Sequence, residues 1–144
     1  MAGSRNDPYG QFNFLIAIDN ITVAGFSEAS GLTTDTNVIE YREGREPQGT
    51  VRKLPGLVKY NNILLKRGWT QDKSLWEWRK KVIDGVTLRT TGSIILLDES
   101  RKVALQWTFR EGWPVKWEGP ALNGKTTEVA IETLEIAHEG LELE

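Results

Sequence analysis

The sequence predicts a mainly β protein, an antiparallel β-barrel or sandwich of two sheets with one flanking α-helix. Several short runs alternate apolar and polar residues with a period of two, which is the pattern of strands with one buried face. Only residues 75–84 repeat their apolar side chains at helical spacing. The length of 144 residues is typical of one domain. We therefore expect residues 1–144 to form a single domain, with residues 1–10 as a flexible N-terminal segment.

The strand-like runs follow one another along the chain. In the first, Phe12, Phe14, Ile16 and Ile18 share one face, and the turn signal Asp19-Asn20 followed by residues 21–25 predicts a hairpin. The other predicted strands, each bounded by Gly, Pro, Asn or charged residues, are 38–42, 57–66, 86–89, 93–98, 103–110 and 128–138.

The predicted helix at 75–84 has recognisable ends. Its apolar stripe consists of Leu75, Trp78 and Val82. Ser74 and Glu77 fit a capping box at the start, and Gly85 stands where a C-terminal cap belongs. We expect the amphipathic face of this helix to lie on the sheet.

The predicted last strand changes its hydrophobic face midway. Val129 and Ile131 fall on one side, and Leu134 and Ile136 fall on the other. Either a β-bulge near Glu132 or a strand covered on both faces would explain this pattern.

The segment 41–56 contains two Pro, three Gly, four basic and two acidic residues. This composition predicts either a long loop or an extended hairpin. A segment of this length is usually functional or disordered, and the apolar Val51, Leu54 and Leu57 favour docking on another surface.

Composition excludes several classes of chemistry. The chain has no Cys and one His, and its net charge is −2. Disulfides, thiolate metal sites and multi-His sites are therefore absent, and no overall positive field is available for nucleic acid. The Glu residues between 128 and 144 fit a solvated strand face and an acidic tail, and His138 fits a hydrogen-bonded or exposed strand end. We expect no catalytic residue, no cofactor and no metal.

Charge is distributed unevenly along the chain. Residues 126–144 contain six Glu and no Lys or Arg, whereas the segment 41–56 carries Arg42, Arg45, Arg52 and Lys53. Two separate solvated surfaces would explain this asymmetry. So would a head-to-tail contact between copies, which closes into rings or propagates into tubes.

Six motifs in order resemble the tail tube proteins of contractile phages and of phage-derived injection particles. They are GFSEASGL at 25–32, IEYREG at 39–44, KLPGLVKY at 53–60, LKRG at 65–68, LWEWR at 75–79 and ETLEIAHEGL at 132–141. The resemblance covers nearly the whole chain. It implies a tail-tube (Hcp-like) fold, six copies closing into a ring, and rings stacking into a hollow tube inside a contractile sheath.

The resemblance also implies partners and an interface. The partners would be further copies of the chain, the contractile sheath protein, baseplate and tube-terminating proteins, and a DNA or effector-protein cargo, with no membrane. Segment 41–56 would reach neighbouring subunits. The candidate subunit and ring-stacking residues are Tyr41, Arg42, Glu43, Arg45, Arg52, Lys53, Leu54 and Pro55, with Glu135 and Glu139 on the acidic side.

Two other functions stay open at this point. A monomeric, lipocalin-like barrel would bind a small apolar ligand near Trp107. An enzyme would need His138 or a carboxylate pair in a cleft. The N-terminus lacks the apolar region of a signal peptide, so we expect synthesis in the bacterial cytoplasm, followed by incorporation into a virion tail or an injection particle.

Overall fold

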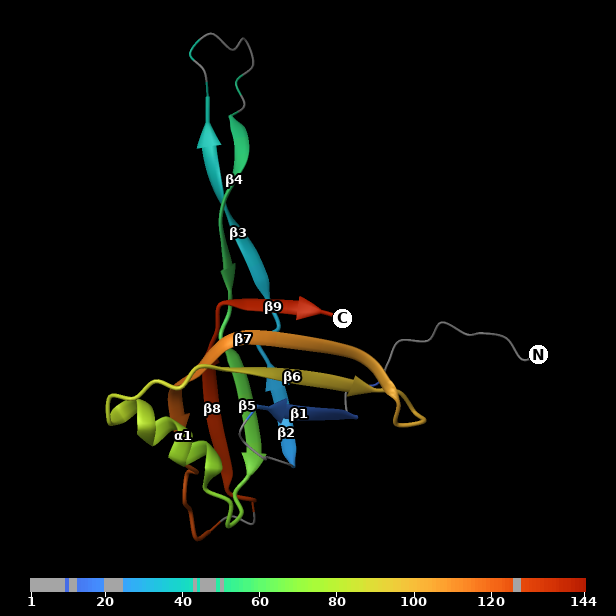
Figure 1. Ribbon diagram of the computed structural model, residues 1–144, viewed down its shortest axis with the longest axis vertical. Helices are drawn as coiled ribbons and strands as arrows, with labels where there is room; N and C mark the ends of the chain where they lie inside the picture. Colours follow the sequence, from blue (N-terminus) through green and yellow to red (C-terminus); the bar gives the residue numbers. More distant parts are fainter. Residues whose placement is uncertain are drawn as a thin grey trace, which may run out of the picture.

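The computed structural model describes residues 10, 13–19, 25–42, 44, 49, 51–125 and 128–144. These residues form antiparallel strands and an α-helix (Figure 1). In chain order the elements are β1 Phe14–Ile18, β2 Phe26–Ser30, β3 Thr34–Tyr41, β4 Arg52–Tyr60, β5 Ile63–Gly68, α1 Ser74–Ile83, β6 Thr90–Leu97, β7 Val103–Glu118, β8 Ile131–Ala137 and β9 Gly140–Leu143. Across the described residues, no helix has the length and apolar character needed to cross a bilayer.

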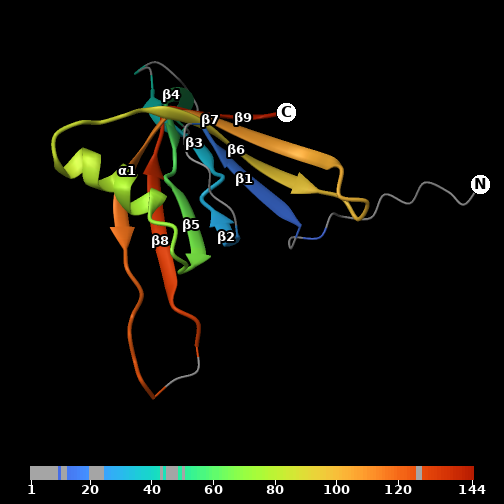
Figure 2. The same cartoon turned by 60° about the horizontal axis from the view of Figure 1, so that its bottom comes forward.

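The body consists of two antiparallel sheets that share β7 (Figure 2). Sheet A has the order β1-β6-β7-β9, and sheet B has the order β7-β8-β5-β2. Residues 103–112 of β7 pair with β6, and residues 113–118 pair with β8. Glu111, with φ of 55°, lies where β7 passes between the sheets. In the described part of the chain β1 and β2 do not pair, so the predicted two-sheet fold is confirmed as an open sandwich.

The core lies between the two sheets. Alternate residues of β5 and β8 enter it, and Ile63, Leu65, Leu134 and Ile136 are almost completely buried. Phe109 of β7 is also fully buried. Its ring lies against Gly92 and Gly112, where any Cβ atom would collide with it. Glycine at these two positions therefore makes room for Phe109, the largest fully buried apolar side chain among the described residues.

Helix α1 confirms the predicted helix and its C-terminal cap. Leu75 and Trp78 are buried. Gly85 has φ of +91°, and its N–H donates to the Val82 carbonyl. The predicted capping box is wrong, because Ser74 lies inside the first turn and the residue at the N-cap position makes no side-chain cap hydrogen bond. Instead, Asp72 Oδ1 accepts a hydrogen bond from the Ser74 N–H at 2.9 Å.

Several strand predictions need correction. The predicted strand at 86–89 is an extended connection, in which the Val86 N–H donates to the Lys81 carbonyl at the end of α1. The run 57–66 is divided at Asn61 and Asn62 into β4 and β5. In the predicted first hairpin, β1 pairs with β6, and residues 20–24 lie outside the described residues.

Strand β8 has no bulge near Glu132, and one of its faces is buried while the other is half-buried. It starts at Ile131, its pairing with β5 is regular, and its buried face consists of Glu132, Leu134 and Ile136. The apolar pattern changes sides because a core position is occupied by Glu132, which is 1% exposed and pairs with Arg67. The sequence suggests a solvated acidic face for Glu132, and this prediction is wrong because the residue is buried.

Candidate assembly interface

Strands β3 and β4 form a hairpin, which we call the arm, that projects from the body (Figure 1). Every residue of β3 is exposed, and in β4 only Gly56 and Tyr60 are partly covered. The described residues of segment 41–56 that lie on β3 and β4 therefore belong to the outer part of an extended hairpin, one of the two forms that the composition of the segment allowed. A two-stranded hairpin has little stability of its own in water, so this arm requires cover from outside its own chain.

Apolar side chains occupy both faces of the arm. Ile39 lies opposite Leu54 on one face, and Val38 lies opposite Pro55 on the other. Val38 is 60% exposed, and Leu54 is 45% exposed. Apolar side chains clustered in this way on a surface mark contact sites, so either face of the arm is suited to packing against a partner.

Six of the sequence-predicted interface residues lie together in the outer part of the arm. Opposite one another across the two strands stand Tyr41 and Arg52, Glu40 and Lys53, and Ile39 and Leu54. Arg42 follows β3 directly and is exposed. Glu43 and Arg45, which the sequence also suggested, lie outside the described residues.

The two acidic candidates lie on the body. Glu135, on β8, accepts a hydrogen bond from Asn62 Nδ2 at 2.7 Å. Glu139, just after β8, forms an ion pair with Arg89 at 3.1 Å, and both side chains are about half exposed. Each carboxylate therefore has a partner within its own subunit, and neither is adjacent to the basic residues of the arm in this chain.

The base of the arm is tied to the core through His138. The His138 ring lies 5.7 Å from the Tyr60 ring and 6.0 Å from the Phe109 ring, measured between centroids. Its Nε2 lies 2.9 Å from the Asn61 carbonyl oxygen, and its Nδ1 lies 3.1 Å from the Gly140 carbonyl oxygen. As the sequence suggested, His138 is a hydrogen-bonded residue at a strand end, and here it fixes the turn between β4 and β5.

Sheet A offers strand edges at both sides. In the described part of the chain, β1 pairs only with β6, and β9 pairs only with β7. In sheet B, residues 113–118 of β7 lie beside α1. Arg79 Nη1 on this helix donates to the Pro114 carbonyl at 3.2 Å. Unpaired edges are templates for pairing with another chain. Among the described strands, sheet A has such an edge on both sides, whereas in sheet B it is β2, paired only with β5, that has one.

A buried polar network, which the sequence did not reveal, positions α1 against sheet B. Arg67 donates from Nη1 to Asp72 Oδ2 at 3.0 Å and from Nη2 to the Asp72 carbonyl at 2.9 Å. Trp117 Nε1 donates to Glu132 Oε2 at 2.9 Å. The Ser74 N–H and then the Arg67 guanidinium hold the pKa of Asp72 below its usual value. The sequence does contain a sign of this network. Arg67 and Glu132 each occupy a position in a strand pattern whose other members on that face are apolar.

An ion pair also lies on the outer face of sheet B. Lys116 Nζ lies 2.8 Å from Glu118 Oε1. Their hydrogen bond raises the pKa of Lys116 and lowers the pKa of Glu118. Both side chains are largely exposed, so this pair contributes little to stability.

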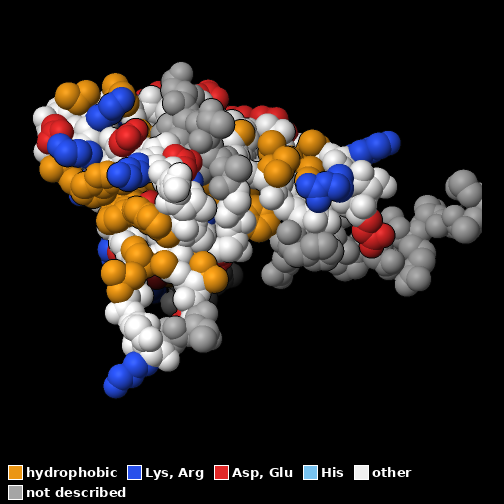
Figure 3. Space-filling view, turned by 90° about the horizontal axis from the view of Figure 1, so that it is seen from below, with side chains coloured by type: hydrophobic (Ala, Val, Ile, Leu, Met, Phe, Trp, Pro, Cys, Tyr) orange, Lys and Arg blue, Asp and Glu red, His pale blue; other side chains and the backbone are white. Residues whose placement is uncertain are grey.

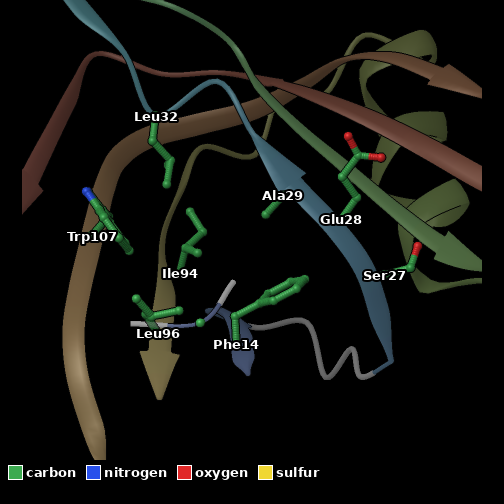
Figure 4. Close-up of a pocket in the computed structure, with 9 residues that line it drawn as sticks. Phe14, Ser27, Glu28, Ala29, Leu32, Ile94, Leu96 and Trp107 are labelled. Atoms are coloured by element: carbon green, nitrogen blue, oxygen red, sulfur yellow. The ribbon is translucent and has the colours of Figure 1, made fainter. Parts of the chain in front are cut away.

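A pocket of about 300 Å³ lies beside Trp107, on the side where β1 and β2 leave the sandwich open (Figure 4). Its apolar lining includes Phe14, Ala29, Leu32, Ile94, Leu96 and Trp107. This is the place where the ligand-binding alternative expected its site. Among the described residues, no cluster of three or more His, Asp or Glu could hold a metal ion.

Comparisons with known proteins agree on one structural family. The structure resembles the anti-feeding prophage (AFP) baseplate, 6-fold symmetrised, with a TM-score of 0.85 and 26% identity over 96% of this chain and 97% of that chain. The extended PVC sheath-tube complex of an extracellular contractile injection system gives a TM-score of 0.82 at 20% identity, covering 96% and 93% of the two chains. Hcp1 from Flavobacterium johnsoniae shares the fold with a TM-score of 0.58 and 14% identity, over 92% and 94%.

The family assignment rests on the sequence match. No curated protein sequence matches the chain. The family model for the T4-like virus tail tube protein gp19 matches residues 10–142, which is nearly the full length, and none of these comparisons points to a ligand-binding barrel. The chain belongs to the T4-like tail tube protein family.

Proposed function

We propose that six copies of this chain close into a ring and that the rings stack into the hollow inner tube of a contractile phage tail or injection system. The observation that carries the proposal is the arm, whose apolar side chains are exposed on both faces. An uncovered hairpin of this kind is stabilised when other copies pack against it. The six-fold symmetry of the similar AFP baseplate structure supports the ring size.

Ring closure would use the edges of sheet A. Pairing of β9 with β1 of the adjacent subunit would continue the antiparallel ladder and remove both unpaired edges. The closed ring would then be lined by one continuous sheet. On the outer face of sheet A, Gln106 Nε2 donates to Ser93 Oγ at 3.3 Å, and Thr108 Oγ1 donates to the Glu144 carboxylate at 3.2 Å.

The arm would form the contact between rings and between neighbouring subunits. We assign this contact to Tyr41, Arg42, Arg52, Lys53, Leu54 and Pro55, which lie together on the arm, and on sequence grounds to Glu43 and Arg45. Glu135 and Glu139 are the acidic counterparts on the body. Each already has an internal partner, so the arm would compete with or extend these pairs.

The chain would act as one structural unit and not as an enzyme. Residues 1–144 would be a single tail-tube domain, made in the bacterial cytoplasm and then built into a virion tail or an extracellular injection particle. Its partners would be the sheath, the baseplate and the tube terminator. The similar PVC sheath-tube complex supports the sheath as a partner, and the lumen would carry DNA or an effector protein.

Negative-stain electron microscopy of the purified protein, over a range of protein and salt concentrations, tests this function. We expect rings or hollow tubes, and a size-exclusion profile that shifts toward larger species as protein concentration rises. A strict monomer under every condition, with a bound apolar ligand retained through purification, would support the ligand-binding barrel instead.

A further inference from the structure

This inference rests on the proposed tube. If the arm joins one ring to the next, another subunit must carry a surface against which the arm packs. The body carries such a surface at the end opposite the arm, on the β5–α1 and β7–β8 connections (Figure 1). We call it the apolar end. Its members are Trp69, Leu122 and Val129, which are 37%, 84% and 71% exposed. Figure 3, which views the molecule from this side, shows hydrophobic side chains gathered there.

The apolar end is fixed to the core. The Trp69 N–H donates to the Ala130 carbonyl at 2.8 Å, which joins the two connections. The Trp69 ring packs edge-on against Trp117 at a centroid distance of 5.8 Å, and Trp117 lies 4.8 Å from Trp76. Because Trp117 also donates to the buried Glu132, this surface is preorganised, which lowers the entropic cost of binding.

Geometry favours a head-to-tail contact. The arm and the apolar end lie at opposite ends of the long axis of the molecule (Figure 1). A second copy displaced along that axis therefore brings its apolar end to the tip of the first arm. A contact between two different surfaces propagates without limit, as a tube requires. The exposed apolar residues Ile83, at the end of α1, and Val86 and Leu88, just after it, belong to the side of the body, away from this axis.

Net charge does not oppose the same pairing. The described strands of the arm, with Arg42, carry four cations and two carboxylates, a net charge of +2. The connections at the apolar end, from residue 69 to 73 and over the described residues from 119 to 130, carry two carboxylates and two lysines, a net charge of zero. A basic surface and a neutral surface do not repel each other, so apolar packing decides this contact.

We propose that Trp69, Leu122 and Val129 form the docking surface for the arm of a second copy in the next ring. The apolar side chains near the tip of the arm, Ile39 and Leu54 on one face and Val38 on the other, pack against this surface. When rings stack, each subunit therefore buries the apolar side chains of its arm at one end and its apolar end at the other.

Cross-linking tests this pairing, because the chain has no cysteine of its own. Leu54→Cys and Leu122→Cys are combined in one chain, where the two sites lie too far apart to join within a subunit. After tube assembly and mild oxidation, we expect a ladder of covalent oligomers on a denaturing, non-reducing gel. The matched control combines Leu54→Cys with Val103→Cys, which is 60% exposed at the start of β7. A ladder no stronger than that of the control would overturn the proposal.

A charge substitution supplies an independent readout. Leu122→Glu places a carboxylate in the proposed apolar contact, and we expect rings to form but the protein concentration needed for tubes to rise by roughly tenfold or more. Val103→Glu is the control and should behave as wild type. Normal tubes from Leu122→Glu would overturn the docking surface and leave the proposed tube intact, and loss of sheath binding alone would assign the surface to the sheath instead. Absence of tubes from the wild-type protein would overturn both proposals.

Discussion

Arg67 and Glu132 form a buried ion pair that joins β5 to β8 inside the sandwich. Arg67 Nε donates to Glu132 Oε1 at 2.5 Å, and the two residues are 2% and 1% exposed. They are direct neighbours in the register of the two strands. The same guanidinium reaches Asp72 at the start of α1. One side chain therefore holds the sheet and the helix in a fixed relation.

We predict that Glu132→Ala strongly destabilises the fold. It leaves the Arg67 charge buried without its main partner, which typically costs about 3–5 kcal/mol. Urea unfolding followed by tryptophan fluorescence measures this, in an arm variant that does not assemble, so that polymerisation does not contribute. The double variant Arg67→Met/Glu132→Leu removes both charges and should be more stable than Glu132→Ala. If the single and double variants lose the same stability, the pair is not coupled as described.

Asp72 should make stability depend on pH in the acid range. Its pKa is lowered from 3.8 in the folded protein, chiefly by the Ser74 N–H and also by Arg67. A carboxylate with a lowered folded pKa stabilises the fold above its unfolded pKa, and this stabilisation is lost as pH falls through the folded pKa. The difference in urea midpoint between wild type and Asp72→Asn should therefore shrink as pH falls from about 5 toward the acid limit. A difference that stays constant with pH would contradict this.

Reversing the charge of the arm should block growth of the tube without unfolding the body. Arg42→Glu, Arg52→Glu and Lys53→Glu together convert the basic outer part of the arm into an acidic one. We expect unchanged circular dichroism, with tubes absent by electron microscopy. The matched control reverses three exposed cations away from the arm, Lys81, Arg101 and Lys102, and should still assemble. Tubes of wild-type length from the arm variant would refute the role assigned to the arm.

Gly92→Ala should disturb the centre of the core. An added Cβ would collide with the Phe109 ring and also lie 3.2 Å from the Ala17 carbonyl oxygen. Overpacking of this kind costs about 1–3 kcal/mol. Gly124→Ala is the control, because its Cβ would meet nothing within 4 Å. Thermal unfolding of both variants checks the prediction, and equal midpoints would show that Phe109 moves aside freely.

Local periodicity was sufficient where one face of an element is buried. The alternation of Ile16 and Ile18 in β1 and the stripe of Leu75 and Trp78 in α1 both predict elements that the structure contains. It failed at Glu132, because the residue that compensates this buried charge, Arg67, lies 65 positions away. A charged residue at a core position marks each strand, but the pairing between the two strands leaves no periodic signal within either one.

The arm was harder to predict for the opposite reason. Both of its faces are exposed, so the sequence there shows no alternation between buried and exposed residues and reads like a loop. Its basic residues still marked it as a candidate interface, and Arg52 and Lys53 both lie in the outer part of the arm, on opposite faces of β4. The contributions of Glu135 and Glu139 could not be judged from the sequence, because their partners Asn62 and Arg89 come from other segments.

The most direct test of the account is the rotational symmetry of the assembled particle, measured from end-on class averages by electron microscopy. We expect hollow rings with six-fold symmetry and a sheet-lined central channel. Solid or asymmetric particles, or rings with another number of subunits, would contradict the proposed tube.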